Sequence, residues 1–398
     1  MPALKSESRR GTYVRSSVAG ETVRAFIPPP LPPIPALDLS GLHQQLDCAN
    51  QGLGRLNGMT RLLPDVRFLL YLYVLKEALV SSQIEGTQSS FTDLLLFENE
   101  AVPSVPIEDV EEVSNYVAAM QHGLRRLRGG FPLSLRLIRE IHAILLRGGR
   151  GANRSPGEFR RTQNWIGGSR PGNASFVPPP PERLMECLDA FERFLHDERH
   201  TLPILVEAGL AHVQFESIHP FLDGNGRVGR LLITLVLCSK GALTEPLLYH
   251  SLYLKTNRSQ YYELLQRVRT DGAWEDWLAF FLEGVAVAAQ EAADTAERTL
   301  RLFADDRKEI EKLGRASTSA LRVQELMQRN PFVRIRTAAK ALKLTIPTVT
   351  SALNHLVQLG IVKEISGKRR HRLFAYSRYV NIVGEGTKPL SVPSADTL

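Results

Sequence analysis

The stretch IHPFLDGNGRVGR, residues 218–230, sets one histidine, one aspartate, one asparagine and two arginines among three glycines. The apolar run LLITLVLC, residues 231–238, follows it directly. A polar cluster of this density is typical of a loop, whereas the apolar run predicts a buried helix. We therefore expect a loop that opens onto the first turn of a helix, a place where proteins bind anions.

The residue types in this loop match the chemistry of a nucleotide phosphate. Gly224 and Gly226 allow backbone N–H groups to approach an anion closely, and the positive end of the following helix points at the same place. Arg227 and Arg230 lie three residues apart and project from one side of that helix, where guanidinium groups grip phosphate oxygens. The pattern predicts a phosphate site. The alternative is a glycine-rich helix cap whose charges are merely solvated.

Two further residues of the loop favour catalysis over binding alone. Asp223 offers a hard oxygen ligand suited to Mg²⁺, which accompanies phosphates. His219 is the one side chain of the stretch that exchanges a proton near neutral pH. Phe221, between polar neighbours, is expected to anchor the loop in the core. Together these groups predict phosphoryl or nucleotidyl transfer, with His219 activating the nucleophile.

The bulk composition is that of a globular protein, with 43% hydrophobic and 23% charged residues in a chain of 398, a length typical of two or three domains. Cys48, Cys187 and Cys238 form no CxxC pair and are expected to be reduced thiols. The sequence has no apolar run of the roughly 18–20 residues that span a membrane, and its N-terminus lacks the apolar stretch of a secretory signal. These features predict a cytoplasmic protein with no membrane partner.

Positive charge is concentrated near the C-terminus. Residues 317–384 hold twelve Lys and Arg against two acidic residues, a net charge of +10, whereas the whole chain carries +7. The remainder therefore carries −3. Segregation of this kind predicts a polyanionic partner for the C-terminal part.

Helical periodicity dominates most of the chain and predicts a mainly α fold. Residues 66–86 give its strongest piece, closed by a glycine, and an Ala- and charge-rich stretch at 284–313 predicts one long linking helix. The proline-rich segment AFIPPPLPPIP, residues 25–35, is expected to be extended in polyproline II conformation. Within NWIGGSRPGNASFVPPPP, residues 164–181, the turn signal RPGN between two strand-like runs predicts a β-hairpin.

The segment HPFLDGNGRVGR, residues 219–230, resembles the signature of Fic-domain proteins, HPFx(D/E)GNGRxxR, at every defined position. The resemblance implies a helical core that transfers AMP from ATP, with Mg²⁺, to a Ser, Thr or Tyr hydroxyl of a target protein or of the chain itself, releasing pyrophosphate. It implies His219 as the base and Asp223 as the Mg²⁺ ligand. It implies phosphate binding through Gly224, Asn225, Gly226, Arg227 and Arg230, with Arg227 at the transferred phosphoryl group and Arg230 at the γ-phosphate.

Two other stretches resemble parts of the same family. The hairpin predicted at 164–181 resembles the flap beside the catalytic loop, whose edge pairs with an extended target segment; the alternative is an ordinary surface hairpin. The hexapeptide SSQIEG resembles the inhibitory motif (S/T)xxxE(G/N), with Ser81, Glu85 and Gly86 at its defined positions. In that motif the glutamate pairs with the second arginine, here Arg230, so that ATP binds only in a non-productive pose. Without the resemblance, a solvated helix end is the simpler interpretation.

Asn257, Tyr261 and Tyr262 lie at the distance from the loop where the family contacts adenine, and this makes them candidates for nucleotide binding. Aromatic residues at helical spacing are equally typical of a core. The family also includes members that transfer other nucleotides or phosphocholine, so UTP and GTP stay open beside ATP.

After residue 317, three short helical patterns and two strand-like runs predict a winged helix-turn-helix domain. Its third helix, residues 347–360, is expected to bury Val349, Leu353 and Leu356. The candidates for DNA contact are Thr348, Thr350, Ser351 and Asn354 on that helix and Lys368, Arg369, Arg370 and Arg372 in the wing. The alternative is a winged helix that serves protein contact or dimerisation.

The predicted organisation is an N-terminal extension with the inhibitory helix, a Fic core, a linker helix, a winged helix domain and a flexible tail, at residues 1–106, 107–290, 291–316, 317–384 and 385–398. The leading hypothesis is an autoinhibited protein adenylyltransferase. One alternative is a deAMPylase in which Glu85 positions a water; another is a DNA-bound regulator whose nucleotide site is only a sensor. A homodimer is left open, because no residue pattern demands one.

Overall fold

The computed structural model describes residues 9–18, 20–59, 66–98, 106–148, 151–197, 199, 201–367 and 372–389. Its helices are α2 (His43–Met59), α3 (Val66–Ile84), α4 (Phe91–Glu98), α5 (Ile107–Arg128), α6 (Leu135–Leu145), α7 (Pro181–His196), α8 (Ile204–Ile218), α9 (Asn225–Ser239), α10 (Ser251–Thr256), α11 (Arg258–Asp271), α12 (Trp274–Glu311), α13 (Ser317–Arg329), α14 (Ile335–Leu342), α15 (Ile346–Gln358) and α16 (Ser377–Val383). Its strands are β1 (Thr12–Val18), β2 (Glu21–Ile27), β3 (Phe332–Arg334), β4 (Lys363–Glu364) and β5 (Leu373–Ala375). The predicted mainly α fold is confirmed. Within these ranges no helix has both the length and the apolar character needed to cross a bilayer.

The centre of the molecule is the helix pair α8 and α9, which pack against each other. Every residue of α8 from Leu205 to Ile218 is buried, and so is every residue of α9 from Arg227 to Leu237. A helix that is buried all round is stable only inside a core, because no face of it can be solvated. The buried helix predicted after the polar loop is therefore confirmed, and the loop lies between the two central helices.

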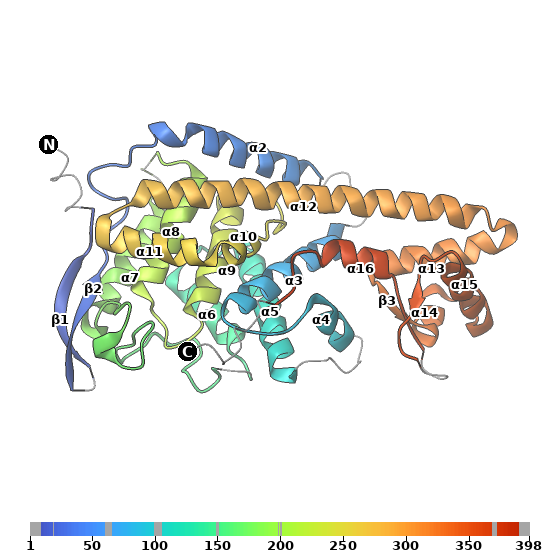
Figure 1. The fold of residues 1–398 in the computed structure, drawn as a ribbon, viewed down its shortest axis with the longest axis horizontal. Coiled ribbons are helices and arrows are strands. Elements are labelled where there is room, and N and C mark those ends of the chain that lie inside the picture. Colours follow the sequence, from blue (N-terminus) through green and yellow to red (C-terminus); the bar gives the residue numbers. More distant parts are fainter. Residues whose placement is uncertain are drawn as a thin grey trace, which may run out of the picture.

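One helix of 38 residues, α12, runs along the length of the molecule (Figure 1). Its start lies in the core through Trp274 and Trp277, and its middle packs against α2. The packing uses small residues, since a Cβ placed on Gly52 of α2 would lie 3.0 Å from Cβ of Ala289. The predicted linking helix is thus present, but it begins at Trp274, after the break at Gly272. The domain boundary predicted at residue 290 falls inside it.

The β-hairpin of the fold lies near the N-terminus, where β1 pairs antiparallel with β2 (Figure 1). The stretch 164–181, predicted as a hairpin, holds a 3₁₀ turn at Pro171–Asn173 and a single β-bridge between Ile166 and Phe176. The predicted turn is therefore present, whereas the prediction of two strands is wrong. The proline-rich segment 25–35 belongs to β2 up to residue 27 and has neither helix nor strand beyond it.

The residues around the turn explain why no ladder forms there. Gly167 and Gly168 have positive φ, and the run that begins at Pro178 has no backbone N–H to donate. The loop joins the true hairpin instead: the N–H of Phe26 in β2 donates to the carbonyl of Val177 over 2.8 Å. We refer to residues 164–180 as the flap.

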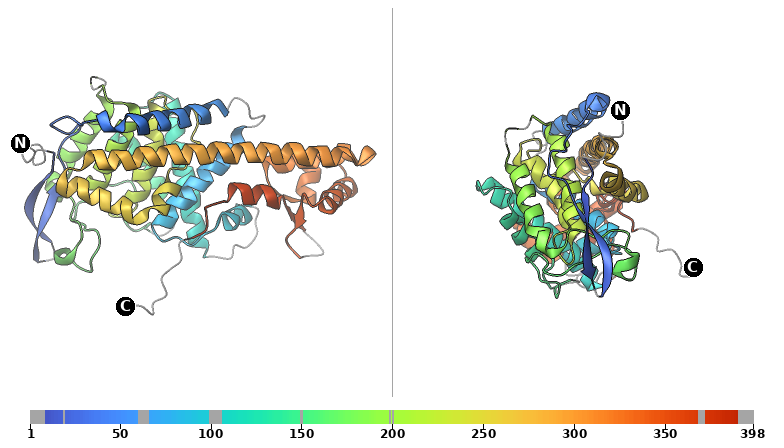
Figure 2. Two further views of the ribbon diagram at one scale, coloured as in Figure 1. Left: turned by 45° about the horizontal axis from the view of Figure 1, so that its top comes forward. Right: turned by 90° about the vertical axis from the view of Figure 1, so that its left-hand side faces the viewer.

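After α12 the chain forms a second unit of α13, α14, α15 and a three-stranded antiparallel sheet in the order β3-β5-β4 (Figures 1 and 2). The predicted burial of Val349, Leu353 and Leu356 in α15 is confirmed. The second strand-like run ends at Ala375, and the chain then forms α16, which packs against α3. The predicted wing residues Lys368, Arg369 and Arg370 lie outside the described residues.

Candidate active site

The loop of residues 219–224 is shaped by the first residue of α9. The side chain of Asn225 accepts a hydrogen bond from the N–H of Phe221 and donates one to its carbonyl, both over 2.8 Å. Phe221 is fully buried and stacks on the imidazole of His142, with 3.6 Å between ring centroids. The loop is thus anchored in the core as expected. The Asn225 side chain, predicted to face phosphate, is bonded to the loop itself, which leaves its backbone N–H for an anion.

His142 of α6 is a residue that the sequence analysis missed. Its Nδ1 accepts the N–H of Gly157 over 2.8 Å, and its Nε2–H donates to the backbone oxygen of Asp223 over 3.0 Å. Because the Gly157 amide can only donate, the ring is neutral with its proton on Nε2. Burial lowers the pKa of His142 to about 4. The residue therefore holds the loop in place, and it has no free nitrogen for acid–base work.

His219 caps α8 in a left-handed backbone conformation, with φ 49° and ψ 61°. A residue other than glycine pays roughly 1–2 kcal/mol for this conformation, which concentrates at functional sites. Burial, with Arg269 and Arg160 nearby, lowers the pKa of His219 to about 3. The imidazole is 18% exposed and neutral at physiological pH. It is able to accept a proton from a group that reaches the loop.

Arg160 was also missed, and it fixes the backbone of the loop from the flap side. Its Nε donates to the carbonyl of His219 over 3.0 Å, and its NH2 group donates to Pro179 O over 2.5 Å and to Ile218 O over 3.4 Å. Its backbone N–H donates to Pro220 O over 2.9 Å. Burial lowers the pKa of Arg160 to about 10, so it remains charged. One buried side chain therefore ties the flap to the loop.

The two arginines of the motif lie on the buried side of α9, each beside a carboxylate. Arg227, whose side chain is 2% exposed, lies 2.8 Å from Glu112 of α5 and 3.5 Å from Asp223. Glu112 is 3% exposed and was not predicted. A buried guanidinium needs such a partner, because an unpaired charge in a core is costly.

Arg230 is bound by the end of α3. Its Nε donates to the hydroxyl of Ser81 over 2.9 Å, and its NH2 group donates to the Ser81 carbonyl over 3.0 Å and to Glu85 Oε1 over 2.6 Å. Burial raises and Arg230 lowers the pKa of Glu85, with a net lowering, so the carboxylate is charged. A Cβ placed on Gly226 would collide with that same Oε1. The Glu85 carboxylate thus lies over the first turn of α9, where the helix dipole favours an anion. Gly86, with φ 101°, follows the end of α3.

Asp223 has the features of a magnesium ligand that works with phosphates. Its side chain is 37% exposed, and its Oδ1 accepts the N–H of Gly224 over 2.6 Å. The described ranges hold no group of three or more His, Cys, Asp or Glu that would enclose a metal ion. Mg²⁺ at nucleotide sites takes one or two carboxylates and completes its shell with phosphates and water, so a single carboxylate fits that ion.

The three adenine candidates have different surroundings. Tyr261 is 1% exposed and shares a 2.9 Å hydrogen bond with Nε2 of His212, which is a core contact. Asn257 donates to Tyr253 O over 3.1 Å where α10 meets α11. Tyr262 is 43% exposed and lies within the electrostatic reach of Glu85. Of the three, Tyr262 is the one that lies at the surface near Glu85.

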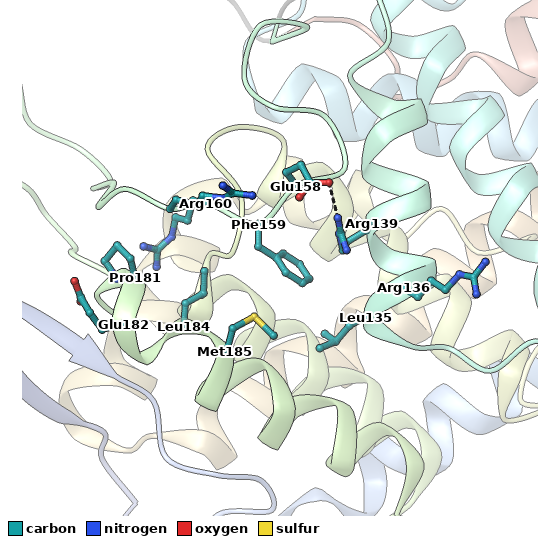
Figure 3. Close-up of a pocket in the computed structure, with 11 residues that line it drawn as sticks. Leu135, Arg136, Arg139, Glu158, Phe159, Arg160, Pro181, Glu182, Leu184 and Met185 are labelled. Carbon is teal, nitrogen blue, oxygen red and sulfur yellow. Dashed lines mark hydrogen bonds and ion pairs between the residues drawn. The ribbon is translucent and has the colours of Figure 1, made fainter.

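A pocket of about 650 Å³ lies behind the loop, between α6, residues 158–161 and the start of α7 (Figure 3). Arg139 donates to Glu158 across it over 2.5 Å. Its Phe159 packs against Phe221 with 5.2 Å between ring centroids, and its Arg160 binds the loop as described. The residues predicted to hold the nucleotide do not line this pocket. It therefore borders the candidate site without forming part of it.

The DNA candidates are distributed over α15 and the wing. Ser351 and Asn354 are exposed, whereas Thr350 donates its hydroxyl to Ile346 O over 2.8 Å and Thr348 shares one with Thr345 over 2.7 Å. Arg372 lies over the ring of Phe374, 4.7 Å from its centroid. Of the candidates on this helix, Ser351 and Asn354 are the two that are exposed.

Comparison with known proteins agrees with this geometry. Residues 43–125 match the model of the Fic/DOC family N-terminal region, and residues 132–237 match the model of the Fic/DOC family. At these residues the chain thus carries an N-terminal region and a domain of the Fic/DOC family. The second match ends within α9 and contains the whole 219–230 motif.

Curated relatives carry the name protein adenylyltransferase Fic. The one from Drosophila grimshawi is 32% identical over 223 residues, which cover 55% of this chain and 41% of the relative. The one from Culex quinquefasciatus is 33% identical over 225 residues, covering 55% of this chain and 39% of the relative. The chain thus spans about two fifths of the length of the curated relatives it matches.

Solved structures share the fold. A Fic family protein from Desulfovibrio desulfuricans superposes with a TM-score of 0.57 at 19% identity, covering 86% of this chain and 97% of that one. A Fic domain containing signalling protein from Bacteroides thetaiotaomicron gives a TM-score of 0.51 at 20% identity, covering 63% of this chain and 97% of that one. At these identities the likeness extends to the fold alone.

Proposed function

We propose that this protein is an adenylyltransferase that transfers AMP from ATP to a hydroxyl side chain of a protein, and that it holds itself inactive through Glu85. The observation that carries the proposal is the meeting of four kinds of group at one helix start: a neutral histidine, a partly exposed carboxylate, the backbone N–H groups of the first turn and two buried arginines. The names of the curated relatives support the same activity.

In the proposed reaction, the α-phosphate of ATP lies against the backbone N–H groups at the start of α9. His219 accepts the proton of the target hydroxyl, whose oxygen then attacks the α-phosphorus. The bond from that phosphorus to the bridging oxygen breaks, and pyrophosphate leaves. Mg²⁺ held by Asp223 would neutralise phosphate charge. Arg227 and Arg230 stabilise the charge on the phosphates, as positioned guanidinium groups do in phosphoryl transfer.

The proposed inhibition follows from where the Glu85 carboxylate lies. It binds Arg230 over 2.6 Å and lies over the first turn of α9. It therefore occupies the guanidinium and the positive helix end that would otherwise bind the γ-phosphate. Two anions cannot share that place without mutual repulsion. ATP then binds without its triphosphate in line for attack.

The test uses α-labelled ATP and Mg²⁺ with wild type, Glu85→Gly, and Glu85→Gly/His219→Ala. We expect label on the protein in Glu85→Gly and only background in the other two. Glu111→Gly serves as a control for introducing glycine in place of a helical glutamate away from Arg230. Equal labelling of wild type and Glu85→Gly would contradict the proposed inhibition by Glu85. Labelling of the double variant would contradict the role of His219 as the base. No label in any variant, with added candidate targets, would contradict the transferase.

We also propose that the C-terminal unit is a winged helix that binds DNA. The exposed Ser351 and Asn354 on α15 and the charge of +10 over residues 317–384 support it. Binding of duplex DNA, followed by fluorescence anisotropy, is expected to weaken steeply with salt and to weaken further in Asn354→Ala. Gln358→Ala on the same helix is the control. Salt-independent or absent binding would favour a protein partner for this unit.

A further inference from the structure

Glu216 lies one turn before His219 in α8 and takes no part in the reaction as described above. Its Oε2 is 4.0 Å from Nδ1 of His219. The residue is 6% exposed, and its other oxygen, Oε1, is buried without a hydrogen-bond partner. Nδ1 of His219 is likewise buried and makes no hydrogen bond of regular geometry, although the backbone of Glu216 also faces the imidazole. Buried polar atoms without a hydrogen bond destabilise the folded state and are uncommon in native proteins. Two of them beside the candidate base therefore suggest a functional role.

The space for this carboxylate is provided by a glycine. A Cβ placed on Gly229 of α9 would collide with Glu216 Oε1, so no other residue at that position leaves the side chain where it is. Charged and titratable groups face it from three places in the fold: Glu85 just after α3, Arg230 of α9, and Arg269 and Tyr261 of α11. Burial and Glu85 raise the pKa of Glu216 against the effect of the two arginines, to about 7.

We propose that Glu216 is the positioning residue of His219: its ionised carboxylate accepts the Nδ1–H of the imidazole and leaves the Nε2 lone pair for the target hydroxyl. This inference rests on the proposed transferase activity. The hydroxyl proton moves to Nε2, and the imidazolium so formed lies beside the Glu216 carboxylate, which stabilises it. A move of less than 1.5 Å would bring the present 4.0 Å separation to hydrogen-bond distance, and catalytic hydrogen bonds are commonly long before substrate binds.

The two groups titrate in different ranges, which makes the proposal testable by pH. His219 stays neutral down to its pKa of about 3, so its own protonation does not limit the rate near neutral pH. Glu216 is protonated below its pKa of about 7 and ionised above it. Loss of Glu85 lowers that pKa, because Glu85 is one of the groups that raise it. An acidic limb below pH 7 in the pH-rate profile of Glu85→Gly therefore reports Glu216.

The experiment measures initial labelling rates of Glu85→Gly and Glu85→Gly/Glu216→Gln from pH 5.5 to 8.5 at several ATP concentrations. We expect the double variant to lose the acidic limb, because glutamine does not titrate. We expect its kcat to fall by about tenfold to a hundredfold, less than the roughly 10²–10⁴-fold of general base catalysis, because the base itself is kept. The KM for ATP should stay within about twofold. Glu207→Gln, another buried glutamate of α8, bound to Lys240, is the matched control.

A second readout does not depend on activity. In ¹⁵N-labelled wild type at pH 8, His219 is expected to be the Nδ1–H tautomer, and in Glu216→Gln to become a mixture. If Glu85→Gly fails to label at any pH, the proposed function fails, and the tautomer still decides the role of Glu216. If Glu85→Gly labels but the double variant keeps its rate, its acidic limb and its tautomer, the positioning role is overturned.

A second and independent observation concerns Gln83, two residues before Glu85 in α3. The side chain is 2% exposed and bonded at both ends. Its Nε2 donates to Ser89 O over 2.9 Å and to Thr387 O over 2.8 Å, and its Oε1 accepts from Lys255 Nζ over 2.7 Å. Lys255 Nζ also donates to the carbonyl of Lys388. The chain that leaves α16 is thus bonded to α3, the helix that ends directly before Glu85.

Residues 384–388 make further contacts along the same side. A Cβ on Gly384 would lie 3.4 Å from the ring of Phe91, and Glu385 pairs with Arg298 over 2.6 Å. That exposed pair contributes little, so the buried bonds of Gln83 hold the segment. We infer that residues 384–388 act as a latch on the end of α3, and that its release weakens the Glu85–Arg230 pair. This too rests on the proposed inhibition.

The test compares two truncated chains, one ending at residue 383 and one ending at residue 389. The shorter chain is expected to label itself at least fivefold faster than wild type, with Glu85→Gly as the upper limit, and the longer one to match wild type. Hydrogen exchange of the amides at 81–86 should be faster in the shorter chain alone. Unchanged exchange and labelling in the shorter chain would overturn the latch. Faster exchange in the shorter chain without labelling, while Glu85→Gly becomes labelled, would also overturn the latch. Absence of label in Glu85→Gly would instead contradict the proposed function.

Discussion

The guanidinium of Arg160 donates a hydrogen bond from its Nε to the backbone oxygen of His219, over 3.0 Å. A side chain outside the loop therefore holds the backbone of the proposed base, which is left-handed. Arg160 in turn binds Pro179 of the flap, so the segment that would receive a target and the residue that would deprotonate it share one support. Positioning of this kind lowers the cost of orienting reactants at the moment of reaction.

Arg160→Lys is predicted to uncouple the flap from the loop. Lysine keeps the charge but cannot reach the carbonyls of residues 179, 218 and 219 together, and each buried acceptor left unpaired costs about 1–3 kcal/mol. We expect a free energy of unfolding lower by that amount and at least tenfold slower labelling in the Glu85→Gly background. Chemical denaturation and labelling rates measure the two effects. Arg161→Lys, at the exposed neighbouring position, should change neither.

Glu112→Gln is predicted to destabilise the protein through Arg227. The substitution keeps the shape of the side chain but removes the charge that lies 2.8 Å from a guanidinium only 2% exposed. Breaking a buried pair typically costs about 3–5 kcal/mol, because one charge stays buried. Urea unfolding should show a loss of that order, against no change in the exposed control Glu108→Gln of the same helix. A loss below 1 kcal/mol would mean that Asp223 alone neutralises Arg227.

Acidification is predicted to destabilise the fold through its buried histidines, of which His142 is the clearest. Its folded pKa of about 4 lies below the ordinary value of 6.5, so below pH 6.5 the unfolded chain takes up the proton first. Stability is therefore complete above pH 6.5 and is lost as the pH falls, by roughly 3 kcal/mol at pH 4 from this residue alone. Urea midpoints at pH 7.5, 6 and 5 check the slope. His142→Gln should lose less stability on acidification than wild type.

Gly151→Ala is predicted to disturb Asp223, the proposed ligand of Mg²⁺. A Cβ there would lie 2.7 Å from Oδ2 of Asp223, and the backbone has φ +90°, which costs alanine roughly 1–2 kcal/mol. Gly148→Ala is the control: its backbone is also left-handed, with φ +73°, but a Cβ there has no neighbouring atom within 4 Å. The comparison separates the effect of backbone strain from the effect of the contact with Asp223. In the Glu85→Gly background we expect Gly151→Ala alone to raise the Mg²⁺ concentration for half-maximal labelling. Chelation of the metal should abolish labelling in all variants, and equal Mg²⁺ dependence of the two alanine variants would contradict the role of Asp223.

Much of the fold followed from local pattern. The apolar run after the motif requires burial on all sides, and the i, i+4, i+7 spacing in α15 specified its core face. The β1–β2 hairpin was not predicted. The turn residues of the flap led to a hairpin being predicted there, although the alternating residues of TYVRSSV and ETVRAFI, on either side of Gly20, are the better signal. Those two strands carry the only seven-residue ladder of the described chain.

The residues of the site that lie close together in the sequence could be predicted, whereas those that the fold brings together from distant segments could not. His219, Asp223, Arg227 and Arg230 stand within twelve residues, and their types alone state a chemistry. The residues that hold these side chains and their loop in place come from other segments of the chain: His142 from α6, Arg160 from the segment before the flap, and Glu112 from α5. In its local sequence each of them looks like an ordinary residue. Glu216 is nearer in sequence, but only the packing of α9 reveals that its carboxylate is buried.

The uninterrupted course of α12 has a consequence for how the whole molecule moves in solution. A helix of 38 residues extends about 57 Å at 1.5 Å per residue, and its inner part is packed against α2 while its outer part carries α13. A single stiff rod through both parts gives the protein an elongated outline that persists as it tumbles (Figure 2). Rotational diffusion should accordingly be anisotropic, with the C-terminal unit reporting the same slow axis as the helical core.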